Sequence, residues 1–329
     1  MNRMLMCVLT VIWLVLAVAI PVGAQEATPS ASPAAGGGDL ASATAWLIDQ
    51  QREDGAFAGF SGEPDPGTTV DAITALVAAD HAGVNTGTSI PEALAYLEGG
   101  DVALVYGQTG VGQAAKLALA LLAAGRDPRD FAMTNPVSIV EAGQNDETGV
   151  YGSGLYDHAY AMMALAATGS EVPASALDAL AATQAENGGW SFDGSTDPAM
   201  VDSNTTSMVV QAMVATGNAD HEVMAPALEF LESTITDDGA AYAPGAEADA
   251  NSTALVLQAM LATGGETAGL EAALATFQTD SGAYFYQAAD RAENLFSTVQ
   301  AIPAAAGAVL PILPEGDATP IAIHGLQAA

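Results

Sequence analysis

Two kinds of apolar segment alternate along the chain between residues 40 and 307. One kind is apolar on nearly all sides, as in residues 207–216 (SMVVQAMVAT) and 254–263 (ALVLQAMLAT). The other is amphipathic, as in residues 174–182 and 225–231, where Asp178 and Glu229 face water. Both patterns predict helices, and a helix that is apolar all round must be covered on every side. We therefore expect an inner set of buried helices and an outer set with one solvated face.

The two segments recur as a pair six times, with a period of about 45 residues, and this period indicates a repeat architecture. A glycine-rich turn with an aromatic residue, then a polar loop, separates the two segments in each copy. Several copies stop at a glycine, as helices commonly do: Gly125, Gly169, Gly217 and Gly264. The chain shows no polar capping repeats of the kind that an open solenoid needs. The sequence therefore predicts an all-α fold, a closed (α/α)6 toroid with no obvious room for strands.

The N-terminal residues have the pattern of a secretory signal peptide. Arg3 precedes an apolar run over residues 4–20, and small residues before Gln25 offer a cleavage site after Ala24. The alternative is an uncleaved membrane anchor, since a run of about 17 residues is at the lower limit for spanning a bilayer. We expect a protein that is secreted or held at the exterior of the cell envelope.

The remaining segments divide by composition. Residues 25–39 are rich in Pro, Ser and Gly and predict a flexible linker. Residues 40–307 hold the six repeats and form the toroid. Residues 308–329 contain prolines that prevent a regular helix, so we expect an extended tail lying on the toroid.

The charge and the cysteine content limit the chemistry of the partners. The net charge is −33 with only six basic residues, so nucleic acid and anionic membranes would be repelled. A small molecule or a protein remains a possible ligand. The single cysteine, Cys7, lies in the predicted signal peptide, so the mature chain would have no disulfide and no thiolate. The histidines other than His158, which are His81, His221 and His324, show no ligand spacing, and we predict no metal and no cofactor.

The turns between paired segments carry a recognisable motif. The turn Gln184-x-x-x-Gly188-x-Trp190 resembles the QW repeat of squalene and hopene cyclases. Gln144 to Tyr151 has the same form with one insertion. Two further turns have another aromatic residue in the last place: Gln51-x-x-x-Gly55-x-Phe57 and Gln278-x-x-x-Gly282-x-Tyr284. Residues 40–307 therefore resemble the α/α-toroid superfamily of terpenoid cyclases and protein prenyltransferases. In the cyclases this turn is a structural clasp, and the resemblance implies the same role here.

The catalytic groups of these relatives are missing from the sequence. The resemblance would require an Asp-x-Asp-Asp acid for a hopene-type cyclase, but the nearest pair, Asp237-Asp238, lies in a clasp turn. The zinc ligands of the prenyltransferases and the Cys-Gly-Glu-Gln run of thioester domains are absent as well. The chain is closest in character to secreted, non-catalytic toroids that are similar to the cobalamin-binding domain of transcobalamin. No residue identifies cobalamin as its ligand.

The starts of the inner helices should line the mouth of the toroid, where a ligand site is expected. His158 is unusual, because the other copies have threonine there, and it could carry a proton, act as a metal ligand or be a hydrogen-bonded wall residue. Capping alone would explain Asp202 and Asp249. Only two aromatic residues, Tyr156 and Phe296, are expected at this rim. The candidate ligand-binding residues are Tyr156, Asp157, His158, Asp202, Asn204, Asp249, Asn251 and Asn294.

Two functions lead from the sequence, and a purely structural envelope protein is a third that stays open. The first is an exported, non-catalytic module that binds a small molecule or a protein at the mouth of the toroid. The second is an enzyme, either cyclase-like or carbohydrate-active, that would use Asp157, His158, Asp202 or Asp249. The shape of the centre separates them: an apolar funnel lined by methionines would favour terpene chemistry, and a plugged centre would favour a surface-binding or structural role.

Overall fold

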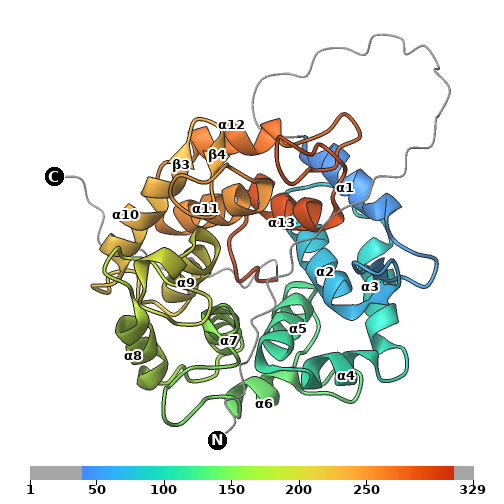
Figure 1. Cartoon of the computed structure of the whole chain (residues 1–329). Helices are drawn as coiled ribbons and strands as arrows, with labels where there is room; N and C mark the ends of the chain where they lie inside the picture. Colours follow the sequence, from blue (N-terminus) through green and yellow to red (C-terminus); the bar gives the residue numbers. More distant parts are fainter. Residues whose placement is uncertain (1–38, 315–329) are drawn as a thin grey trace, which may run out of the picture. The chain divides into compact units, whose positions relative to one another are not determined.

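The computed structural model describes residues 39–314. The predicted signal peptide, the linker up to residue 38 and the tail beyond Pro314 lie outside the described residues. Six inner helices pack side by side in chain order, and the last packs on the first, which closes the ring (Figure 1). They are α2 (Pro66–His81), α5 (Val111–Ala123), α7 (Leu155–Ala167), α9 (Ser203–Ala215), α11 (Ala250–Thr263) and α13 (Leu295–Ala305).

The outer helices lie against the inner ring from outside (Figure 1). Each repeat contributes one of them, and the second repeat adds the short helix α4 (Val102–Gln108). They are α1 (Leu40–Asp49), α3 (Ser89–Glu98), α6 (Pro136–Glu141), α8 (Ala174–Thr183), α10 (Met224–Thr234) and α12 (Ala268–Thr276). The predicted six-pair α/α toroid is confirmed.

The expectation of no strands is wrong in detail. Two short antiparallel pairs form in the clasp turns: β1 (Phe57–Ala58) with β2 (Pro64–Asp65), and β3 (Ile235–Thr236) with β4 (Gly239–Ala240). One 3-10 turn, η1 (Pro198–Met200), precedes α9. These strands are two residues long, so they pin loops and do not alter the fold.

The clasp turns join each repeat to the next. The Gln184 side-chain amide donates hydrogen bonds to the Gly188 carbonyl at 2.6 Å and to the Val223 carbonyl at 2.8 Å, beside the start of α10. Gln51 and Gln144 make the equivalent bonds in their own copies. The Gln278 amide reaches the Asp39 carbonyl at 2.9 Å, at the N-cap of α1. The sixth clasp therefore holds the first helix, and the ring is closed by the same contact that builds it.

Glycine is required in these turns by a close approach. Gly188 has φ +89°, and a side chain there would collide with the Pro226 carbonyl of the next outer helix. Gly282 has φ +99° and would collide with the Ser42 backbone in the same way. Because the left-handed region also disfavours L side chains, only glycine permits this contact.

Candidate functional site

Two of the predicted mouth carboxylates, Asp202 and Asp249, are N-caps. Asp202 accepts hydrogen bonds from the Thr205 N–H at 2.7 Å and the Thr205 hydroxyl at 2.9 Å. Asp249 accepts the equivalent bonds from Ser252 at 2.8 and 2.7 Å. Both carboxylates are almost fully buried. Burial raises the pKa of each, and these hydrogen bonds oppose the rise. The oxygens of these carboxylates are thus already occupied within their own helix starts.

His158 replaces a threonine in the same structural role. In other copies the threonine hydroxyl accepts the N–H of the clasp aromatic, as Thr206 does from Trp190 at 3.0 Å. His158 accepts the Tyr151 N–H through Nδ1 at 2.9 Å, which leaves Nε2 to donate to the Ala176 carbonyl at 3.0 Å. Burial lowers the pKa of His158 to about 4. The ring is therefore neutral at physiological pH, with both nitrogens engaged.

The remaining predicted residues divide between local bonds and the cavity. Asp157 accepts bonds from the Ser153 N–H at 3.0 Å and hydroxyl at 2.7 Å. Asn294 caps α13 by accepting from the Ser297 N–H at 3.0 Å. Asn251 accepts from the Ser297 hydroxyl at 2.8 Å and donates to Gln300. Asn204, half-buried at the start of α9, is approached by the Ser203 hydroxyl at 3.4 Å. Of the eight predicted ligand-binding residues, Tyr156 lines the central cavity.

The inner face of the ring has a register that the sequence analysis missed. The sixth residue after the N-cap of each inner helix lies at one level of the hub. The residue type at this position differs in every copy. Its occupants around the ring are Asp71, Lys116, Tyr160, Met208, Leu255 and Gln300. Four of these residues are polar, and they come from helices that are neighbours around the ring: α13, α2, α5 and α7. They face the two apolar residues, which come from α9 and α11. The centre thus has a polar wall and an apolar wall.

An ion pair dominates the polar wall. The Lys116 ammonium lies 2.6 Å from the Asp71 carboxylate, and their side chains are 25% and 37% exposed. Burial alone would lower the pKa of Lys116, but the carboxylate of Asp71 and then Tyr106 outweigh it and raise the pKa. The ammonium also lies 5.7 Å from the centre of the Tyr160 ring. A charged pair is therefore held at the hub while part of it stays accessible.

Two tyrosines complete the polar wall. The rings of Tyr156 and Tyr160 meet edge to face, with centroids 5.6 Å apart. Burial raises the pKa of both phenols, with smaller contributions from Tyr160 at Tyr156 and from Asp71 at Tyr160. Both hydroxyls remain protonated at neutral pH and can donate hydrogen bonds.

These side chains enclose a cavity of about 120 Å³. Its wall is polar on the side of the ion pair and apolar on the side of Leu255. Leu310, from the segment after α13, forms the floor of the cavity, on the side away from the starts of the inner helices. The lining residues are Asp71, Thr74, Lys116, Leu119, Tyr156, Tyr160, Leu255, Gln258, Val299, Gln300, Pro303 and Leu310.

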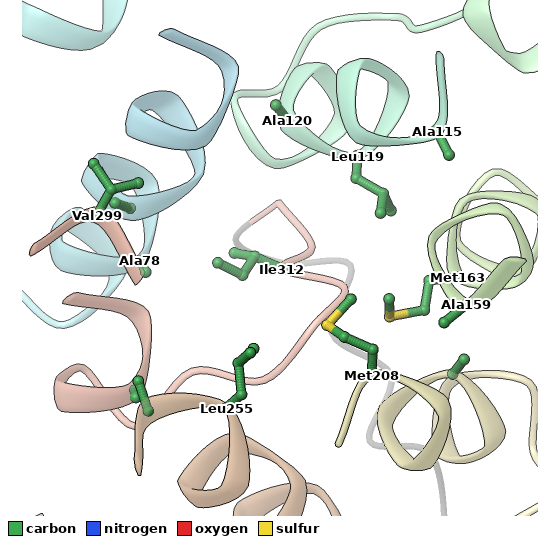
Figure 2. Packing of buried hydrophobic residues seen from close by; sticks show 14 of the residues in the cluster. Ala78, Ala115, Leu119, Ala120, Ala159, Met163, Met208, Leu255, Val299 and Ile312 are labelled. Carbon is green, nitrogen blue, oxygen red and sulfur yellow. The ribbon is translucent and has the colours of Figure 1, made fainter. Parts of the chain in front are cut away.

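The segment after α13 differs from the expectation. The tail was predicted to lie on the toroid, but Ala308–Pro314 enters the hub, and Ile312 lies at its centre (Figure 2). Leu119, Met163, Met208 and Leu255 surround it. The centre is therefore neither an open methionine funnel nor fully plugged, because a cavity remains above the segment.

Exposed aromatic residues mark the mouth above this cavity. Phe192, Tyr242 and Tyr286 each follow the clasp aromatic position by two residues and are 52%, 48% and 44% exposed. Their carbonyls accept the first N–H of α7, α9 and α11, each at 2.9 Å. Phe60 stacks on Phe296 at 3.7 Å between ring centres. The mouth thus carries more aromatic residues than the two expected from the sequence.

Comparisons with solved structures agree with the toroid fold. No family model matches the sequence, and no curated protein matches it. The structure matches the α-1,6-mannanase GH76A of Salegentibacter sp. HEL1_6 with a TM-score of 0.59 and 12% identity, over 82% of this chain and 98% of that one. The type II terpene cyclase MstE from Scytonema matches with a TM-score of 0.58 and 15% identity, over 81% of this chain and 96% of that one. A protein from Actinoplanes matches at 0.56 and 16%, over 82% and 99%.

The chain has the α/α toroid fold. The resemblance to the terpenoid-cyclase type of toroid is confirmed at the level of fold. Structures of variants of this mannanase and of this cyclase hold α-1,6-mannotriose and geranylgeranyl dihydroxybenzoate, respectively. At these identities the likeness carries the fold of the toroid and no activity.

Residues 39–314 contain neither a candidate membrane span nor a candidate metal cluster. No helix there is long and apolar enough to cross a membrane. Within the same range, no three His, Cys, Asp or Glu side chains lie together in a way that could hold a metal ion.

Proposed function

We propose that this chain is an exported module that binds a small molecule in the centre of the toroid, with the polar end of the ligand at Asp71 and Lys116. The observation that carries the proposal is the cavity between an ion pair and an apolar wall, which five of the six inner helices line with their residue at this one register position. The ligand would be neutral overall, because the pair offers one acceptor and one donor of opposite charge. The body of the ligand would be apolar, to match Leu119, Leu255 and Val299.

The electrostatics support this choice of ligand. With a net charge of −33, the chain would repel a polyanion before contact. A neutral molecule with a hydrogen-bonding head is not repelled, and the Tyr156 and Tyr160 hydroxyls can donate to it. The ligands in the mannanase and cyclase structures are also small molecules, which supports a ligand of this size class.

The experiment is a thermal-shift screen of the full chain with short-chain alcohols and amides, geranylgeraniol and mannotriose. A ligand that binds the folded state raises the melting temperature, and the rise grows with the logarithm of its concentration relative to its dissociation constant. Asp71→Asn and Lys116→Met should each reduce the affinity of a hit about tenfold or more, since each removes a charge-assisted hydrogen bond. Glu98→Gln, which removes a charge from the exposed Arg126 pair, is the control. A hit that binds both hub variants as well as wild type would contradict the proposal.

An enzyme is the second candidate, and the neighbours favour it, since the mannanase and the terpene cyclase are both toroid enzymes. The aromatic residues at the mouth, Phe192, Tyr242 and Tyr286, favour a neutral oligosaccharide in that case, because sugar rings stack on exposed aromatic faces. Mass spectrometry of each hit after incubation separates the candidates. A product that forms with wild type and not with Asp71→Asn would indicate turnover, and an unchanged ligand would indicate binding.

A further inference from the structure

The segment Ala308–Pro314 is held in the hub by two specific hydrogen bonds. The Gln258 side-chain amide donates to the Ala308 carbonyl at 3.1 Å, and the Leu310 N–H donates to Gln211 Oε1 at 3.0 Å. Gln211 and Gln258 are buried, and each is the ninth residue after the N-cap of its helix. They lie about one helical turn below the ring of Asp71 and Lys116. The segment therefore forms the floor of the cavity at a defined level.

An apolar side chain anchors this floor. Ile312 is 6% exposed, and it lies among Leu119, Met163, Met208 and Leu255 (Figure 2). Those four side chains come from four different helices, and two of them, Leu119 and Leu255, also line the cavity. Ile312 thus occupies the hub as a branched aliphatic ligand would.

The rest of the toroid does not need the segment in order to close. The ring of α2, α5, α7, α9, α11 and α13 is completed by direct contacts between neighbouring helices. Within residues 309–314 the structure shows one hydrogen bond to the toroid, that of the Leu310 N–H. The segment is held mainly by the burial of Leu310 and Ile312, and a competing apolar group can replace that contribution.

We propose that residues 308–314 are an internal competitor for the lower half of the central site. This inference rests on the proposed function in one respect, that the upper cavity takes a ligand. A short ligand binds above Leu310 with the segment in place. A ligand whose apolar part extends to the level of Gln211 and Gln258 must displace Ile312, so the segment sets the length of ligand that binds readily.

The test uses the neutral apolar dye Nile red and the full chain. Ile312→Asp places a carboxylate in an apolar hub and should expel the segment. Ile312→Ala weakens the anchor. We expect the dye to bind about tenfold or more tightly to both variants, because the burial that holds one Ile no longer opposes the dye. Ile73→Ala is the matched control, since Ile73 is equally buried in α2 but does not line the cavity.

Hydrogen exchange of the Leu310 amide reports whether the segment has left, and near-ultraviolet circular dichroism reports whether the toroid remains folded. Fast exchange with tighter dye binding supports the proposal. Fast exchange with dye affinity equal to that of wild type or Ile73→Ala overturns it. Protected exchange in Ile312→Asp also overturns it, because the segment would then not be detachable. The dye needs only the apolar wall, so these results are independent of any ligand that depends on Asp71 and Lys116.

Discussion

The mouth and the hub of the toroid use polar residues in opposite ways. At the mouth the same residue types return in copy after copy, and each has a local partner: Asp202 caps α9 as Asp249 caps α11. At the hub the equivalent position changes identity in every copy, and Asp71 meets Lys116 across two helices. In a repeat protein, a polar residue that every copy needs serves the repeat. A polar residue that occurs in one copy and has no hydrogen-bond partner within its own repeat is free to serve a ligand.

The largest effect should come from the mouth. Trp190 is fully buried, and its indole N–H donates to the Leu180 carbonyl at 2.8 Å. Trp190→Ala should lower the free energy of unfolding by about 3–5 kcal/mol, since it leaves a large cavity and removes the buried indole hydrogen bond. Urea denaturation measures this loss. Phe192→Ala, two residues away and half exposed, should cost far less, and equal losses would contradict the assignment of Trp190 as a clasp.

His158 should make the stability of the folded chain depend on pH. Its pKa is about 4 in the folded chain and about 6.5 in the unfolded chain, so acid protonates the unfolded state first. The stabilising contribution is complete above pH 6.5 and is lost as the pH falls toward 4. The loss amounts to about 3 kcal/mol in total.

The variant His158→Thr, the residue of the other copies, isolates this effect. Its free energy of unfolding at pH 7 can differ from that of wild type. As the pH falls, this free energy should lack the part of the decline that His158 causes. Asp202 and Asp249, whose raised pKa values act in the opposite direction, are present in both proteins and cancel in the comparison. Parallel curves of unfolding free energy between pH 4 and 6.5 would show that His158 does not titrate as described.

Loss of one cap should have a moderate effect. Asp202→Ala removes the acceptor of the Thr205 N–H, and this should cost about 1 kcal/mol of stability. The affinity of any hub ligand should not change, because Asp202 does not line the cavity. Differential scanning calorimetry and a ligand titration on the same variant test both statements. A variant that kept its stability but lost its ligand would move the site to the mouth.

The smallest effect on stability should come from the hub. Tyr160→Phe removes one hydroxyl from the polar wall, so we expect a stability change within about 0.5 kcal/mol. The affinity of a ligand with a hydrogen-bonding head should fall severalfold, because a donor is lost. Tyr242→Phe at the mouth is the matched control and should leave that affinity unchanged. Calorimetric titration measures both affinities. A loss of affinity in Tyr242→Phe but not in Tyr160→Phe would contradict the assignment of the ligand to the hub.

The fold was predictable because its signals repeat. Six copies of one pattern, and four QW-like turns in phase with it, indicated paired helices in a closed ring, and the Gln184 and Gln278 clasps have the bonds that the motif implies. The site was less predictable for the same reason. The polar residues that repeat at the helix starts predict a ligand site at Asp202 and Asp249. The oxygens of these two carboxylates are used locally.

The hub residues were missed because their signal is a difference between copies. Asp71, Lys116 and Tyr160 stand out only when the six copies are aligned at the N-cap and the sixth following residue is compared. The path of Ala308–Pro314 could not be derived in this way. It depends on two glutamines, Gln211 and Gln258, from different repeats that accept or donate to a segment distant in sequence.

The bond from Gln278 to Asp39 joins the last repeat to the first. An array of stacked repeats with free ends can fray, since its terminal units have a neighbour on one side only. This ring has no terminal unit, so loss of any one repeat would expose both of its neighbours at once. The toroid should therefore melt in a single cooperative step, and a circular permutant opened between two other repeats should melt in the same way.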